Sequence, residues 1–407
     1  MKKYSLFVIA VILLPALCLA GTVSSRWDVT IGGYVKGEIG YSDEGRAQSY
    51  VVPQRESGTT ENIGAEFGNF WGSAVQTRLN FLIKGPDAFG MKTSAFIEGD
   101  FYGQSGSNQG GLRLRHGFVR LTGPQATVTI GQFWQLYGLP FGSGNLINWG
   151  DVGPIAGTRV PQINLDFKAT KTVTLSLGVF QNANPIGFSG TGAVDDFTRG
   201  GPFFQGQILY ASDVCGKIGP NMLSFKVNGF YGREKKTFMV GTSADSESIN
   251  SWGIFASFLV PIIPEKGGKK DGALGFAAAG FISQNPGYIG DPFMTGSGSY
   301  ARTGNKYAAN VLSGGKFEAW YYFTDQYSLT VFYGWEKQNM SNAFATANPN
   351  AVKNAKEFVL SLCYDPNPAM KFGIEWEHNR AKFAAPAGGY KDQGKSNTYR
   401  FAAFYFF

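Results

Sequence analysis

The chain has 407 residues, with 36 Lys and Arg against 29 Asp and Glu, and a formal net charge of +7. The basic residues are spread along the chain without a Lys/Arg tract, which excludes a nucleic-acid-binding tail. Beyond residue 20 no apolar run approaches the ~20 residues of a membrane-spanning helix, and the 3 cysteines are too few for a disulfide framework. Aromatic residues form 15% of the chain and Gly contributes 56 residues, which is typical of many strands joined by tight turns.

The first segment, 1–20, has the pattern of a cleaved secretory signal. Lys2 and Lys3 precede a long apolar run, and Cys18 and Ala20 are small residues at the positions that a signal peptidase reads. The alternative is a retained membrane anchor. Cleavage would leave 21–407 as a single barrel domain of 387 residues (407 minus 20). Its remaining cysteines, Cys215 and Cys363, are expected to be free thiols.

Alternation of apolar and polar residues with a period of two predicts an all-β chain of about sixteen antiparallel strands. The predicted strands are 28–41, 71–85, 89–102, 112–122, 125–134, 161–169, 172–182, 203–212, 221–233, 249–260, 272–284, 310–323, 326–337, 354–364, 368–381 and 396–407.

The connections between these strands alternate between long and short. The segments 42–70 and 135–160 are long, for example, whereas 123–124 and 170–171 are short. One rim of short turns and one of long loops is the signature of a transmembrane β-barrel with periplasmic turns and extracellular loops. A soluble sandwich or propeller has no reason to segregate its loops, and no internal repeat is visible.

The predicted strands have two unlike faces. In the second strand Val75, Leu79 and Phe81 lie on one side and Gln76 and Arg78 on the other. A charged inner face and an apolar outer face fit a sixteen-strand barrel with an aqueous lumen and outer-membrane lipid around it. The alternative, a water-soluble sheet, would need a second layer over its apolar face. Aromatic residues near the strand ends fit interfacial girdles, although β propensity also explains part of them.

The fourth strand, 112–122, is rich in arginine. Arg113 and Arg115 share the face away from lipid, because Leu114 and Phe118 occupy the other face. Arg120 has the opposite parity, so either a bulge intervenes or it lies at the interface. Arg78, Glu98 and Asp100 on the two preceding strands extend this charged cluster. Such a cluster sets ion preference in a pore, and a salt-bridge network that stiffens the wall is the alternative role.

The connection 135–160 is apolar for a loop, with Asp151 and Arg159 as its two charged residues. We expect it to fold into the lumen, pack on the wall and constrict the pore. The alternative is a surface loop that is buried by its own side chains or by a neighbouring subunit.

The last predicted strand, 396–407, ends in Phe404-Tyr405-Phe406-Phe407 and resembles the terminal strand of outer-membrane barrels, whose last Phe is read by the insertion machinery. Its alternation places Arg400 toward the lumen, and Phe401 and Tyr405 toward lipid. We expect this strand to close the barrel against 31–41.

Four blocks in this order carry a family resemblance: QTRLNFLIKGPDAFGMKTSAFIEGDFYG, LRLRHGFVRL, TIGQFWQLYG and DVGPIAGTRVPQ. They resemble the DcaP-like porins of Gram-negative bacteria, over 28–168 above all. The resemblance implies a trimeric sixteen-strand outer-membrane channel for anionic, dicarboxylate-type solutes. It also implies barrel-wall and constriction roles for Arg78, Glu98, Asp100, Arg113, Arg115, Gln132, Asp151, Arg159 and Gln162. The family protein has an N-terminal helical coiled-coil extension, whereas only 21–27 precede the first strand here.

The sequence offers little chemistry for catalysis. His116 and His378 are the 2 histidines, and both share parity with lipid-facing neighbours. No metal-ligand spacing or nucleotide-binding turn occurs, so no cofactor is expected. We predict a homotrimeric diffusion porin of the outer membrane that passes small hydrophilic solutes and favours small anions such as carboxylates. The alternatives are a barrel that sheathes a periplasmic electron carrier and an outer-membrane hydrolase.

Overall fold

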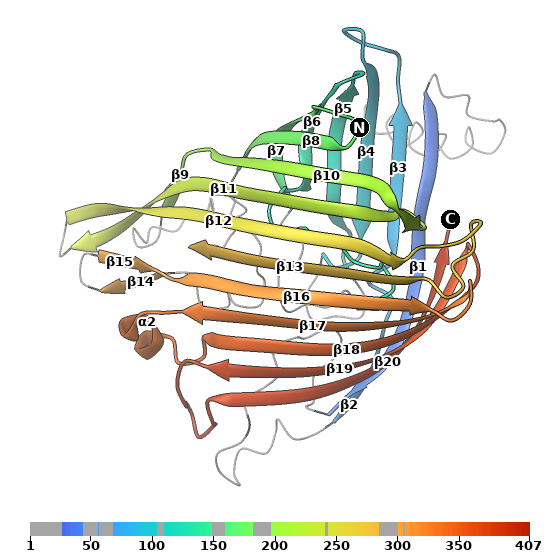
Figure 1. The fold of residues 1–407 in the computed structure, drawn as a ribbon. Helices are drawn as coiled ribbons and strands as arrows, with labels where there is room; N and C mark the ends of the chain where they lie inside the picture. Colours follow the sequence, from blue (N-terminus) through green and yellow to red (C-terminus); the bar gives the residue numbers. More distant parts are fainter. Residues whose placement is uncertain are drawn as a thin grey trace, which may run out of the picture.

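In the computed structural model the chain forms one closed antiparallel β-barrel (Figure 1). The structure describes residues 27–43, 56, 68–103, 110–148, 159–181, 197–240, 243–284, 300–303 and 306–407. The predicted signal segment lies outside these residues. The strands are β1 Asp28–Ser42, β2 Asn69–Ser73, β3 Arg78–Lys84, β4 Lys92–Asp100, β5 Arg113–Thr122, β6 Ala126–Trp134, β7 Arg159–Lys168, β8 Val173–Phe180, β9 Phe197–Gly200, β10 Phe203–Ile218, β11 Asn221–Val240, β12 Ser243–Ile263, β13 Leu274–Gln284, β14 Tyr300–Thr303, β15 Lys306–Ala309, β16 Val311–Tyr322, β17 Tyr327–Asn339, β18 Val352–Asn367, β19 Met370–Phe383 and β20 Gln393–Phe406.

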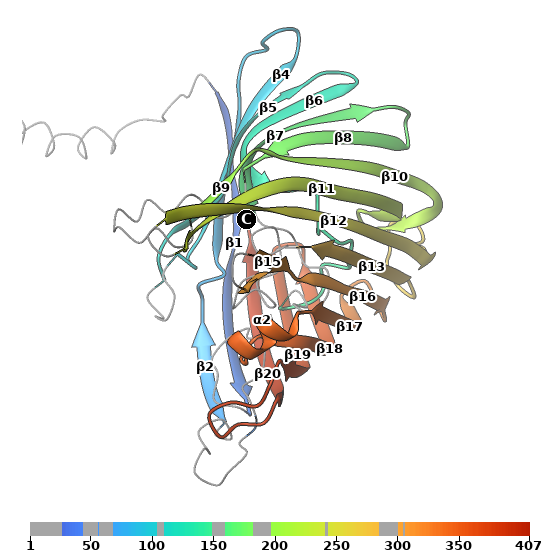
Figure 2. The same ribbon diagram turned by 90° about the vertical axis from the view of Figure 1, so that its left-hand side faces the viewer.

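The wall contains sixteen strands, because two pairs of elements each serve as one strand. Both β2 and β3 pair with β1, and both β9 and β10 pair with β11. The β14–β15 hairpin pairs only with itself among the described residues. Pairing of β1 with β20, from Tyr34 opposite Phe406 to Ser42 opposite Thr398, closes the ring. Figure 2 shows the strands curving from β1 through β12 and back to β20. The predicted antiparallel barrel is confirmed.

Short and long connections separate to opposite ends of the barrel, as predicted. We call these the turn end and the loop end. At the turn end, Lys266 and Lys269 bridge each other across Gly267 and Gly268, whose φ values of 59° and 77° favour glycine. At the loop end a six-residue helix, α2 (Asn342–Ala347), is capped by Ser341. No helix among the described residues is long and apolar enough to cross a membrane.

Alternation along each strand separates a polar inner face from an apolar outer face. On β1 the side chains of Lys36 and Glu38 are buried, whereas Val35 and Ile39 are exposed. On β20 Arg400 is buried and Phe401 is exposed, as predicted. The outer face along the middle of these strands is therefore mainly apolar, and the charged residues there point inward.

The predicted strand 71–85 is interrupted, and its predicted faces are partly wrong. Pairing with β1 stops after Ser73 and resumes at Arg78. In an unbroken strand Trp71, Val75 and Leu79 would share one face, because they are an even number of residues apart. Instead Trp71 and Val75 are buried, whereas Leu79 is exposed, so the interruption reverses the alternation. Alternation of apolar and polar residues in the sequence does not predict where a strand is interrupted.

A second irregularity corrects the fourth predicted strand. The β4–β5 register shifts by one residue, so that Glu98 faces His116 while Gly99 faces Leu114. Arg115 is the extra residue of this bulge. Beyond it His116, Phe118 and Arg120 lie on the inner face with Glu98, so the prediction that His116 and Phe118 face lipid is wrong. The alternative left open for Arg120 is decided in favour of the bulge.

Candidate functional site

The inner faces of β3, β4 and β5 carry a compact ion-pair network. Asp100 accepts two hydrogen bonds from the Arg113 guanidinium, Nε to Oδ1 at 2.9 Å and one terminal nitrogen to Oδ2 at 2.7 Å. Arg115 bridges both acids, with Nε 2.7 Å from Glu98 and a terminal nitrogen 2.8 Å from Asp100. The Arg115 side chain is 3% exposed and that of Arg113 is 40% exposed. These two arginines and two acids therefore neutralise one another, and Arg113 alone reaches open lumen.

Three further arginines surround this network. Arg159, at the start of β7, places its guanidinium 4.4 Å from the centre of the Trp134 ring, and the Arg115 guanidinium lies 5.9 Å from the same ring. Arg78 lies 5.3 Å from the Tyr34 ring. Such cation–π contacts hold arginines in place without cancelling their charge.

Arg120 is positioned nearer the turn end of β5. Its guanidinium lies 4.8 Å from the Phe118 ring, and its Nε donates to the Thr129 hydroxyl at 3.2 Å. The bulge at Arg115 is what turns this side chain inward. Together with Arg159 it adds positive charge to the β3–β7 side of the lumen, beyond the two arginines that Glu98 and Asp100 bind.

The chain from Gln135 to Asn148, which we call the inner segment, leaves β6 and runs inside the barrel. Its contacts follow the wall strands in order. The N–H of Leu136 donates to Gln205 on β10 at 2.9 Å, that of Phe141 to Ser257 on β12 at 3.0 Å, and that of Ser143 to Glu318 on β16 at 2.6 Å. The inner segment therefore lines the wall that continues from β10 toward β20.

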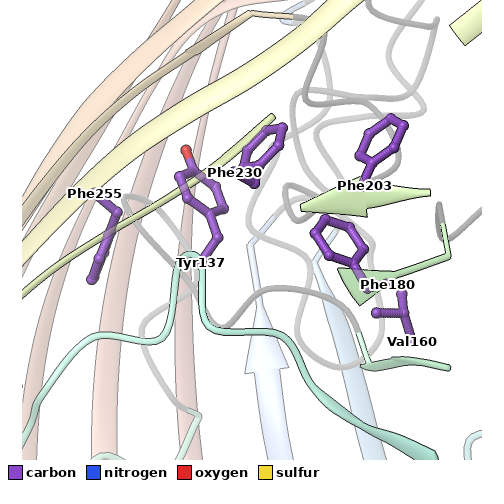
Figure 3. Packing of buried hydrophobic residues seen from close by; sticks show 6 residues of the cluster. All are labelled: Tyr137, Val160, Phe180, Phe203, Phe230 and Phe255. Carbon is purple, nitrogen blue, oxygen red and sulfur yellow. The ribbon is translucent and has the colours of Figure 1, made fainter. Parts of the chain in front are cut away.

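An aromatic cluster fixes the beginning of the inner segment (Figure 3). The Tyr137 ring meets Phe230 edge-on with centroids 4.7 Å apart, and it lies 6.2 Å from Phe255. Phe203 and Phe180 extend the cluster along the wall. The Tyr137 ring fits because Gly253 lies beneath it, where a Cβ atom would stand 2.8 Å from the ring. Rings packed edge to face contribute beyond their buried area and set the entry direction of the segment.

The inner segment reaches deep into the barrel at Asn145. The Asn145 amide donates to the hydroxyl of Tyr322, the last residue of β16, and its oxygen accepts from Lys371 at the start of β19. Its backbone carbonyl accepts from Ser361 and Cys363, each at 3.1 Å. Tyr322 and Lys371 both lie at the turn end, so the segment descends almost the whole height of the wall. Cys363 is a free thiol buried by this contact, and Cys215 is a free thiol exposed on β10.

A buried charge cluster fixes the far end of the inner segment. The Glu375 carboxylate accepts the backbone N–H of Ile147 at 2.7 Å and that of Asn148 at 2.9 Å. Arg400 lies 2.6 Å from Glu377 and 3.4 Å from Glu375. Buried charges require this kind of pairing, because leaving one of them alone costs several kcal/mol.

Lys36 on β1 completes the attachment. Its ammonium group contacts Glu38 at 2.8 Å and the Ile147 carbonyl at 3.1 Å, and Arg400 also approaches Glu38 at 3.6 Å. Gly373 leaves room for Ile147, since a Cβ atom there would stand 2.4 Å from the Ile147 side chain. The segment is therefore attached to the wall at both ends and in the middle.

The structure brings together most of the predicted site residues. Arg78, Glu98, Asp100, Arg113 and Arg115 share the inner face of β3–β5, and Arg159 joins them through Trp134. The two predicted glutamines form hydrogen bonds within the barrel wall. Gln132 donates to the Leu114 carbonyl, and the side-chain oxygen of Gln162 accepts from Gln205. Asp151 lies outside the described residues.

Sequence reasoning missed the second half of the site. The alternation in 371–377 indicates the polar face for Glu375 and Glu377, as that in 396–407 does for Arg400, but no local pattern links these residues to Ile147. The alternation of Lys36 and Glu38 with Val35 and Ile39 was the available signal on the first strand.

The described residues contain no group of three His, Cys, Asp or Glu side chains that could hold a metal ion. The His116 ring lies among Phe96, Phe118 and Trp134, with Nε2 3.9 Å from Glu98. His378 contacts Arg380 and Asn397. Within the part of the chain that the structure describes, no hydrogen bond joins either imidazole to a serine or a thiol.

Comparison with solved structures identifies the fold. The outer membrane channel DcaP of Acinetobacter baumannii superposes with a TM-score of 0.72 at 19% identity, over 96% of this chain and 100% of that one. An anion-selective porin from Comamonas acidovorans (TM-score 0.52, 13% identity, 94% and 100% of the chains) and a trimer form of the Vibrio cholerae outer membrane protein OmpT (0.51, 9%, 94% and 100%) also match. No known family profile and no characterised protein matches by sequence.

Proposed function

We propose that this chain, which has the fold of the DcaP-like outer-membrane channels, is a passive diffusion porin of the Gram-negative outer membrane that favours small anionic solutes. The turn end would face the periplasm and the loop end the outside. The observation that carries the proposal is the inner segment, which runs along one wall of the lumen opposite the arginine-rich strands β3–β7.

The inner segment would narrow the pore between itself and these arginines. The backbone N–H groups of the inner segment form hydrogen bonds with the wall behind it. The passage would then lie between the inner segment and the charged side chains of β3–β7. Glu98 and Asp100 are already matched by Arg113 and Arg115, so the excess positive charge on this side of the lumen comes from Arg120 and Arg159. A low-dielectric wall focuses that charge on passing solutes and raises the local concentration of anions.

A homotrimer is part of the proposal. It is supported by the trimer form of Vibrio cholerae OmpT, whose fold this chain shares. Native mass spectrometry of protein extracted in mild detergent should give three times the chain mass. A monomer under conditions that preserve folded barrel would contradict the trimer without affecting the channel.

The channel is tested in planar bilayers under a tenfold salt gradient. We expect stepwise ohmic currents and a zero-current potential of the sign for anion preference. Replacing Arg120→Gln with Arg159→Gln should shift that potential toward cations, whereas the matched control Lys266→Gln with Lys269→Gln, at the turn end outside the lumen, should shift it less. Absence of current at every voltage would overturn the channel, and a cation-selective wild type would overturn the anion preference alone.

The alternatives fit the structure less well. A sheath for an electron carrier needs an open lumen, whereas the inner segment of this chain already lies against the wall there. A hydrolase needs an activated nucleophile, and the His116 ring is enclosed by aromatic rings. Haem staining of the purified complex and a hydrolysis assay with His116→Ala test these alternatives directly.

A further inference from the structure

The outer face near the loop end changes from apolar to basic in successive cross-strand rows of β17, β18, β19 and β20. The first row consists of Val331, Leu360, Trp376 and Tyr399, and the second of Tyr333, Phe358, His378 and Asn397. The third row is Trp335, Lys356, Arg380 and Lys395, and the fourth is Lys337, Asn354, Lys382 and Gln393. Side chains in these rows share the face of Ile374 and Phe401, which is the apolar exterior.

The third row places three cations side by side. Lys356 is directly opposite Arg380, and Arg380 is directly opposite Lys395, and all three are exposed. Residues directly opposite in a sheet have Cβ atoms about 5 Å apart, and like charges at that spacing are destabilising. None of the three forms an ion pair with a described carboxylate at salt-bridge distance. A row of this kind is stabilised when a polyvalent anion binds across it.

A cavity of about 570 Å³ lies over this row. Its described lining includes Lys356, Arg380, Lys382 and Lys395, and Glu56 is the carboxylate among them. Glu56 is held at the edge of the cavity by Lys391 at 3.3 Å and by Gln393 at 3.1 Å. Its charge is therefore matched by a lysine outside the cavity, and the cavity keeps an excess of positive charge.

The geometry of Arg380 is set for a ligand. Its Nε donates to Nε2 of His378 at 3.0 Å, and His378 Nδ1 lies 2.9 Å from the Asn397 amide oxygen. The terminal nitrogens of a guanidinium held in this way remain for bidentate recognition of a phosphate. The Trp376 indole N–H also donates to the Asn397 amide oxygen at 3.2 Å, so Asn397 connects His378 to an aromatic residue of the first row.

The occupant follows from the order of the rows. Aromatic residues mark the level of the lipid headgroups, and the basic row lies one step farther from the apolar band. A lipid whose acyl chains lie alongside Leu360 and Ile374 would place its headgroup at the level of the basic row. In the outer leaflet of this membrane, a lipid with phosphate groups at that level is a phosphorylated glycolipid. We propose that the row Lys356–Arg380–Lys395 binds the phosphate groups of lipid A. This inference rests on the outer-membrane location and orientation of the proposed function.

The test uses the full-length protein in detergent, stripped of lipid, with bis-phosphorylated lipid A as the probe and native mass spectrometry as the readout. The triple variant Lys356→Gln, Arg380→Gln, Lys395→Gln should lose affinity about a hundredfold, because each basic side chain near an anionic lipid contributes roughly fivefold. The matched control Lys217→Gln, Lys266→Gln, Lys269→Gln removes the same charge at the turn end and should bind as wild type. Dephosphorylated lipid A should bind wild type as weakly as the triple variant binds lipid A.

Three binding results would overturn the proposal: equal binding of lipid A by the triple variant and wild type, an equal loss of affinity in the control, or equal binding of dephosphorylated lipid A by wild type. A change of oligomeric state in the triple variant would also overturn it, because the row would then belong to a subunit contact. Heat-modifiable gel mobility verifies that each variant is folded. Conductance in phospholipid bilayers without lipid A should be unchanged in the triple variant, so failure of lipid binding and failure of the channel are separate outcomes.

Discussion

The carboxylate of Glu375 accepts the backbone N–H groups of Ile147 and Asn148, which precede it by 228 and 227 positions. A hydrogen bond to a charged acceptor is stronger than one to a neutral acceptor, and this buried carboxylate accepts two of them. This contact holds the far end of the inner segment to β19. Under the proposed function, this attachment is one of those that set the width of the lumen.

Replacing Glu375→Gln should loosen the inner segment. An amide offers one oxygen where the carboxylate offers two, and Arg400 loses one of its charged partners. We expect more frequent transitions between conductance levels in single-channel recordings. The control Glu265→Gln also weakens a bond to a backbone N–H, that of Gly219 at the turn end, and should leave the recordings unchanged. Identical traces for wild type and Glu375→Gln would show that this contact does not hold the segment.

The depth of the inner segment can be tested by a crosslink. The Sγ atom of Cys363 lies 3.1 Å from the carbonyl oxygen of Asn145. In a Cys215→Ser background, Asn145→Cys should form an intramolecular disulfide with Cys363 under mild oxidation, seen as faster migration on a non-reducing gel. Ser143→Cys, whose backbone bonds to Glu318 on β16 instead, serves as the comparison and should crosslink poorly. Equal crosslinking of the two would mean that Asn145 has no fixed place on β18.

The two arginines of β5 should differ in their effect on stability. Arg115→Gln leaves Glu98 and Asp100 without their buried partner, which should lower the free energy of unfolding by about 3 kcal/mol. Arg113→Gln removes a half-exposed partner and should cost about 1 kcal/mol. Urea titration followed by gel mobility of the folded barrel measures both. Adding Asp100→Asn to Arg115→Gln should recover part of the loss, and no recovery would contradict the pairing.

Attachment of Glu56 to the loop end should depend on pH. The hydrogen bond from Gln393, and then those from Lys391, lower the pKa of the Glu56 carboxyl despite its partial burial. A lowered pKa in the folded state means that the contact stabilises at pH above the ordinary value of about 4.3 and is lost as the pH falls through the lowered value. The N–H of Lys391, which donates to the Glu56 carbonyl, should lose protection from hydrogen exchange in that acid range.

Glu56→Gln is the matched variant for this experiment. It removes the titrating group while it keeps an acceptor for Gln393, so the protection of the Lys391 N–H should be lower at neutral pH and no longer change with acid. A wild-type profile that is flat from neutral to acid pH would rule out titration of Glu56 as the cause.

The sequence by itself determined the sixteen strands, the two faces of most of them and the closing role of the last one. Each of these properties is local, because successive side chains in a strand point to opposite sides whatever the strand pairs with. Arg400 and Phe401 are one position apart, and their chemistry alone assigns one to the lumen and the other to the exterior.

Only the tertiary structure decided where the alternation breaks and what the lumen contains. The bulge at Arg115 exists through the register of β4 against β5, and it reverses every side chain beyond it, including His116 and Arg120. The inner segment likewise takes its path from partners far away in the sequence, such as Glu318 and Glu375. Strand register and long-range hydrogen bonds depend on which strands pair and in what alignment. The alternation of residues within one strand is a local property and contains no information about its pairing partners.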